Sequence, residues 1–122
     1  MISLIDAPRS ATRDFRQRIM AEIDDLYTMS RDQGINPYKV NVITFCGHGI
    51  THPNGDAIGI VYDTIFAKGD DGKPLPPNSL LRFINFDSLA RKFAALENTI
   101  TVFVLSMCRS LLTPEELNIV QK

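Results

Sequence analysis

Two runs of apolar and β-branched residues, 40–45 and 100–105, constrain the fold of this chain more than any other feature. Runs with so few polar positions indicate strands that are buried on both faces, as in a parallel sheet covered by helices. A sheet of that kind places its ligands and its chemistry where the strands end at their carboxyl side. The sequence therefore predicts an α/β fold with a mainly parallel sheet, and a site just beyond residues 45 and 105.

Length, composition and charge predict a single domain with one hydrophobic core. The 122 residues are 44% hydrophobic, which is enough for one core without disulfides. The net charge of −1 is spread along the chain, which argues against a nucleic-acid or membrane-surface partner. No apolar run approaches the ~18 residues of a membrane span, and two cysteines make no disulfide framework. We expect an intracellular, cytoplasmic protein.

The segments before and between the two runs show further periodic patterns. A short edge strand is predicted at residues 1–5, and a hairpin is predicted where the turn-rich stretch 50–56 leads into the apolar run 57–62. Residues 70–77 have the composition of an exposed loop. An amphipathic helix ending near Gly34 is predicted from the spacing of its apolar residues, which are Phe15, Ile19, Ile23, Leu26 and Tyr27.

A second helix is predicted between the loop and the second strand. Asp87 is its expected N-cap, and Arg91 and Lys92 are expected to face solvent. Its inward residues are expected to be Leu89, Phe93 and Leu96. A capping box at residues 113–116, Thr-Pro-Glu-Glu, predicts a third helix.

His48 follows the first run and Cys108 follows the second. Neighbouring parallel strands would bring these side chains within reach, and a nearby imidazole both favours the thiolate and can protonate a departing amine. Gly49 has no Cβ, so its backbone N–H could donate to an oxyanion. Residue chemistry alone leaves open the alternative of a core histidine beside a buried thiol.

Several stretches resemble the motifs of caspase-like cysteine peptidases, especially metacaspases. Residues 45–49, Phe-Cys-Gly-His-Gly, are similar to the F/Y-S-G-H-G stretch of that family, with Cys46 in place of the small Ser. Gly55-Asp56 is similar to the family's Gly-Asp-Glu, and residues 84–89 to its I-x-D-D-E-L helix start. Residues 104–110 resemble the strand that ends in D-x-C-x-S/G, and residues 11–13 resemble the approach to the family's second helix.

The resemblance implies a three-layer α/β/α fold and a cysteine endopeptidase acting on peptide or protein substrates. Cys108 would be the nucleophile, His48 would protonate the leaving amine, and the backbone N–H groups of Gly49 and Cys108 would form the oxyanion hole. It also implies that residues 1–122 are the large-subunit portion of a longer fold, without its first strand and small-subunit strands. A small-subunit segment or a partner chain would then complete the sheet. The alternative is a catalytically inactive caspase-like module that binds a partner chain.

The departures from the family pattern bear on specificity and metals. Ser106 stands where metacaspases carry the Asp that binds a basic P1 side chain, so no P1 preference is implied. The dyad requires no cofactor. A calcium site is implied only in part, because Asp56 and Asp87 remain while Phe86 replaces an acid, and calcium takes six or more oxygen ligands.

A zinc site is the alternative for the same region, since Cys46, His48, His52 and Cys108 are possible ligands by residue type. Against it, Cys46 occupies a position where the family has a small residue, and His52 falls in a turn. We expect Cys46 to pack as an unreactive small hydrophobe and His52 to be a loop histidine.

Overall fold

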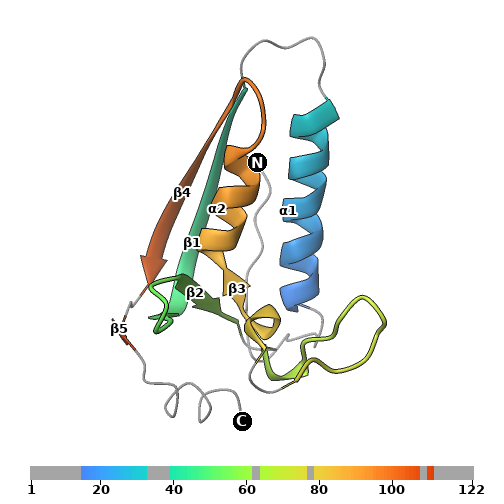
Figure 1. Cartoon of the computed structure of the whole chain (residues 1–122), viewed down its shortest axis with the longest axis vertical. Coiled ribbons are helices and arrows are strands. Elements are labelled where there is room, and N and C mark those ends of the chain that lie inside the picture. The colour runs from blue at the N-terminus through green and yellow to red at the C-terminus, as the bar shows by residue number, and fades with distance from the viewer. Residues whose placement is uncertain (1–14, 33–38, 62–63, 77–78, 108–109, 112–122) are drawn as a thin grey trace.

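A computed structural model describes residues 15–32, 39–61, 64–76, 79–107 and 110–111. The elements predicted at residues 1–5 and 113–116 and the helix stop at Gly34 lie outside the described residues, as does the side chain of Cys108. Figure 1 shows the described elements with their labels. They are α1 (Phe15–Asp32), β1 (Lys39–Thr51), β2 (Ala57–Ile60), the 3₁₀ turns η2 (Thr64–Phe66) and η3 (Leu80–Arg82), β3 (Ile84–Asn85), α2 (Phe86–Ala94), β4 (Thr99–Met107) and β5 (Ser110–Leu111).

The strands form one mixed sheet in the order β3-β2-β1-β4, with β5 also paired to β1. The long ladder is parallel and runs from Lys39↔Thr99 to Gly47↔Met107. The prediction that the two apolar runs are neighbouring parallel strands is thus confirmed. β2 pairs antiparallel with β1, and β3 pairs antiparallel with β2, so the sheet is mixed, with its longest ladder parallel.

The predicted hairpin is confirmed, with Thr51 paired to Ala57 across a tight connection. The connection turns at Gly55, whose φ of 96° is a conformation that favours glycine. His52 closes the turn, because its N–H donates to the carbonyl of Asp56 at 2.9 Å and its carbonyl accepts from the N–H of Gly55 at 2.7 Å. The loop predicted at 70–77 is exposed along most of its described part, residues 70–76.

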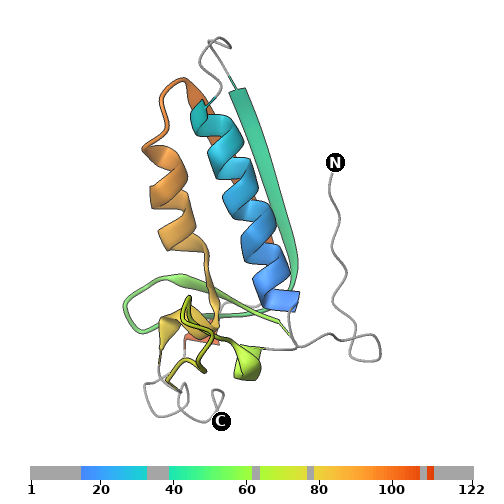
Figure 2. The ribbon, with the colours of Figure 1, turned by 90° about the vertical axis from the view of Figure 1, so that its right-hand side faces the viewer.

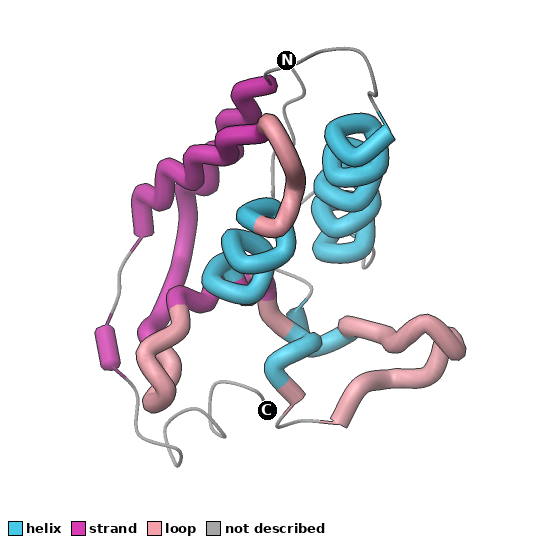
Figure 3. Tube along the Cα trace, turned by 45° about the horizontal axis from the view of Figure 1, so that its top comes forward, coloured by secondary structure: helices cyan, strands magenta, loops and turns pink. Residues whose placement is uncertain are grey.

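Both described helices lie on the same side of the sheet, as Figures 2 and 3 show. The core between these two layers contains Ile23 of α1 and Phe93 of α2, with Phe45 of β1 and Phe103 of β4 packed against it. The opposite face of the parallel ladder is exposed, and it carries five aliphatic side chains that are 44–65% accessible: Val40, Val42, Ile100, Val102 and Val104. The expectation of strands buried on both faces is therefore wrong for this face. The third layer stays a prediction.

α1 matches the predicted amphipathic helix, with Phe15 and Ile23 buried. Arg16 is a charged residue of this helix that is nevertheless only 8% exposed. Its Nε and Nη2 donate to the carbonyl of Phe83 at 3.3 and 3.1 Å, so a buried backbone acceptor is satisfied by a side chain 67 positions away. A helical period cannot reveal a partner that distant.

α2 begins two residues earlier than predicted. Its N-cap is Asn85, whose side-chain oxygen accepts from the N–H of Ser88 at 3.0 Å. Asp87 lies in the first turn, where its carboxylate accepts from the N–H of Ala57 instead. The correction follows from β3, because the extended backbone of Asn85 pairs with β2 and leaves the helix to begin at Phe86. The other expectations hold, with Leu89 and Phe93 buried and Arg91 and Lys92 exposed.

Candidate functional site

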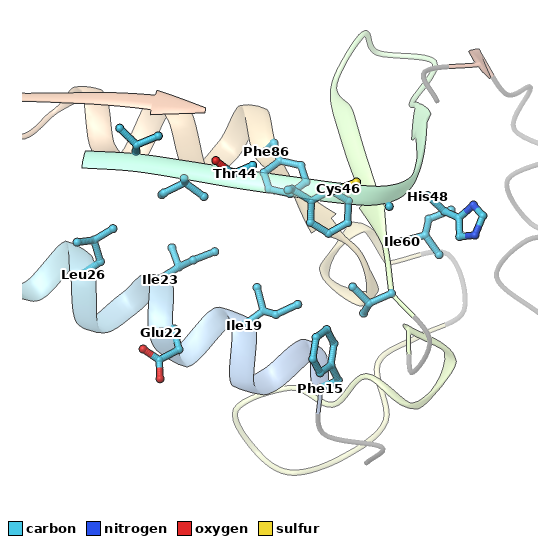
Figure 4. A pocket seen from close by; sticks show the side chains of 15 residues that line it. Phe15, Ile19, Glu22, Ile23, Leu26, Thr44, Cys46, His48, Ile60 and Phe86 are labelled. Carbon is cyan, nitrogen blue, oxygen red and sulfur yellow. The ribbon is translucent and has the colours of Figure 1, made fainter. Parts of the chain in front are cut away.

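A cleft of about 670 Å³ separates α1 from β1. Figure 4 shows α1 running along one wall and β1 along the other, with Phe15 and His48 toward one end and Leu26 toward the opposite end. The lining is mainly apolar, and its ionisable carboxylate and imidazole are Glu22 and His48. A volume of this size lies in the range of small-ligand sites, about 300–1,000 Å³.

His48 is exposed and pairs with Ile60 where β1 changes partner from β4 to β2. Because His48 is exposed, the alternative of a core histidine is wrong. An accessible imidazole at this position can take part in proton transfer. Gly49 is buried and pairs with Gly59, and its expected role as an oxyanion donor stays a prediction.

Cys46 was expected to be packed and unreactive, but it is exposed. The reason is the alternation along β1: residues 43 and 45 face the helices, and residues 42, 44 and 46 face the uncovered side of the sheet. Cys46 pairs with Ser106, the residue that stands where metacaspases carry Asp. This thiol therefore has to be controlled for in any labelling experiment.

The pairing register brackets the position of Cys108. Gly47 pairs with Met107 before it, and Ile50 pairs with Ser110 after it, so the offset between partners is 60 in both cases (107 − 47 and 110 − 50). The two positions on β1 between these pairs are His48 and Gly49. On the facing segment they are 108 and 109, which lie outside the described residues.

Asp56 and Asp87, the two acids that the calcium hypothesis needs, make contacts within the protein. Asp56 Oδ2 accepts from Asn85 Nδ2 at 2.9 Å and lies 3.8 Å from the Arg91 guanidinium. Asp87 is bound to the N–H of Ala57. Together these contacts join the end of the hairpin to the start of α2. In the part of the chain that is described, no group of three or more His, Cys, Asp or Glu side chains is arranged to hold a metal ion.

His52 is a turn residue as expected, and its Nδ1 accepts from the N–H of Asn54 at 3.2 Å. The zinc alternative would also need Cys108, so it is not tested. Gly59 is a site-shaping residue that the sequence did not reveal: it lets the ring of Phe86 pack against β2 beside Phe45. The sequence signal that could have indicated this role is the position of Gly59 within the apolar run 57–62.

Comparison of the chain with protein families, with curated proteins and with solved structures gives no match. Within the described residues, neither helix combines the length and the apolar character needed to cross a membrane. Function therefore has to be argued from the geometry of the site.

Proposed function

We propose that this chain is the large-subunit portion of a caspase-like cysteine endopeptidase with a His48–Cys108 dyad. The observation that carries the proposal is the common register of the pairs on either side of the two residues, Gly47↔Met107 and Ile50↔Ser110. The parallel direction of β1 and β4 also supports it, because carboxyl ends of parallel strands meet at one edge.

In the proposed reaction the Cys108 thiolate attacks a peptide carbonyl and His48 donates a proton to the leaving amine. The backbone N–H groups of Gly49 and Cys108 stabilise the oxyanion. Water then hydrolyses the thioester and frees the thiol. The exposure of His48 supports this role, since a peptide bond has to reach the imidazole.

Thiol labelling tests the dyad without knowledge of the substrate. In a Cys46→Ser background, iodoacetamide should alkylate Cys108 with a pH midpoint below the ~8.5 of a free thiol, because the imidazole favours the thiolate. His48→Ala should raise that midpoint. His52→Ala is the matched control, because His52 is held in the neighbouring turn, and it should leave the midpoint unchanged.

Cleavage of a fluorogenic peptide mixture tests the activity itself. Activity should survive Cys46→Ser and be lost in Cys108→Ala and in His48→Ala. A midpoint that does not respond to His48→Ala, together with no cleavage in the presence of a small-subunit segment, would contradict the peptidase.

The second candidate is a non-catalytic caspase-like module that binds a partner chain, and the exposed aliphatic face of the sheet favours it.

Calcium is a further expectation of the family. In each of these carboxylates, Asp56 and Asp87, Oδ2 accepts a hydrogen bond, from Asn85 in Asp56 and from Ala57 in Asp87, so a calcium ion would share the carboxylates with these contacts. Isothermal calorimetry with Ca²⁺, repeated on Asp56→Asn, checks this expectation.

A further inference from the structure

β1 has one edge that is only partly paired by the described strands. On one side it pairs with β4 along residues 39–47. On the other side β2 pairs only with residues 48–51. Along residues 39–47, that second side therefore has no partner among the described strands. A strand edge of this kind presents backbone N–H and C=O groups that can pair with another extended segment.

The cleft lies along this same edge. Its lining includes residues 42–48 of β1 and, facing them, Ile19, Ile23 and Leu26 of α1 (Figure 4). In Figures 1 and 3, α2 lies over the β1–β4 pair, whereas α1 lies beyond β1 on the side away from β4. Seven strand residues span ~23 Å at 3.3 Å each. The space is thus long, narrow, apolar on the helix side and polar along the backbone edge, which is the environment of one further strand.

We propose that residues 1–5 form that strand, parallel to β1 and covered by α1. Their sequence, Met-Ile-Ser-Leu-Ile, is apolar at four of five positions. A side chain from such a strand would meet Ile19 and Ile23, which line the cleft from α1. This inference goes beyond the proposed function and does not depend on peptidase activity.

The connection to α1 favours this occupant. Phe15 begins α1 and lies at the His48 end of the cleft. The carboxyl end of a strand parallel to β1 would also lie at the His48 end of the cleft. The connector between this strand and Phe15 therefore does not have to run the length of the sheet. Residues 6–14 are nine residues that reach up to ~30 Å, at about 3.3 Å each. The segment, α1 and β1 would make a strand–helix–strand unit, in which the helix returns the chain to a parallel neighbour.

Tethering also decides between this segment and a strand from another molecule. A segment attached through a short linker acts at an effective concentration in the millimolar range. The same segment of a second copy competes only at the bulk protein concentration. The intramolecular strand therefore fills the edge, and a foreign peptide can pair with it only by displacing residues 1–5.

Disulfide trapping tests the placement in the full chain. In a Cys46→Ser, Cys108→Ser background, Thr44→Cys is combined with Ser3→Cys or with Leu4→Cys. Strand side chains alternate, so one of these two positions faces the same side as position 44. We expect rapid intramolecular disulfide formation in one of the two double variants, because adjacent strands hold Cα atoms within the 4.4–6.8 Å that a disulfide needs. Met29→Cys, exposed on α1, replaces Thr44→Cys in the control and should not crosslink.

Each other outcome overturns the proposal. Equal crosslinking to positions 44 and 29 would show an unplaced segment, and a disulfide between two molecules would assign the edge to a second copy. Hydrogen exchange gives an independent measurement. Ser3→Pro removes a backbone donor, and it should raise the exchange rates of those amides in residues 42–47 that point away from β4 at least tenfold, while Ser10→Pro in the connector should not. Unchanged exchange in Ser3→Pro would also contradict the strand.

Discussion

At the scale of the residue, Gly59 shows how closely the sheet and α2 approach. A Cβ at this position would lie 2.6 Å from Cε2 of Phe86 and 3.3 Å from Cζ of Phe45. The Phe86 ring is buried and packs against Phe45 with a centroid distance of 5.0 Å, so it has little room to move. Gly59→Ala should lower the free energy of unfolding by about 1–3 kcal/mol, measured by urea denaturation.

Gly47→Ala is the matched control in the same sheet. Its Cβ would meet the Phe45 ring at 3.4 Å, an ordinary contact distance, so the free energy of unfolding should change by no more than about 1 kcal/mol. If both substitutions cost the same, the close approach of Phe86 to β2 is wrong.

At the scale of the element, α2 is fixed to the hairpin through its first residues. Asn85 caps the helix by accepting from Ser88 and donates to Asp56 at 2.9 Å. Asn85→Ala should lower the free energy of unfolding by about 1–2 kcal/mol, because the cap and the bond to Asp56 are both lost. Thermal unfolding followed by circular dichroism measures this.

Two further variants separate the cap from the bond to Asp56. Asn85→Asp keeps the cap acceptor but removes the donor and adds a second carboxylate, so its destabilisation should be larger at pH 7 than at pH 4, where carboxylates are partly protonated. Ser88→Ala removes only an exposed contact with Arg91 and should be close to neutral. An Asn85→Asp variant as stable as the parent at pH 7 would show that the bond to Asp56 contributes nothing.

At the scale of the whole molecule, the uncovered aliphatic face of the sheet dominates the expected behaviour. Burying a valine or isoleucine is favourable by about 1.5–3 kcal/mol, and five such side chains lie together on two adjacent strands. We expect the isolated chain to associate as its concentration rises, and the variant Val42→Lys, Val102→Lys to associate less. Sedimentation velocity over a range of concentrations is the measurement.

The control is Met29→Lys, which adds a charge at an exposed position of α1 outside this face. It should leave the association unchanged. A parent chain that sediments as a monomer at every concentration would show that the face needs no partner.

Much of the framework could be predicted from the sequence because it depends on local patterns. The six-residue apolar runs correctly predicted neighbouring parallel strands, and the turn residues around Gly55 correctly predicted the hairpin. Helical periods gave the buried faces of α1 and α2. The site was predicted in part: His48 is exposed at the point where β1 changes partner, while its pairing with Cys108 stays a prediction.

The sequence by itself determined where strands and helices form and which side of each helix is apolar, since periodicity and turn chemistry act within a few residues. Only the tertiary structure decided which face of the sheet the helices cover. That choice exposes Cys46, and the segment that contains Phe83 buries Arg16, because burial depends on which distant element packs against a side chain. The tertiary structure also decided that Asn85, and not Asp87, caps α2, because pairing with β2 holds the backbone of Asn85 extended.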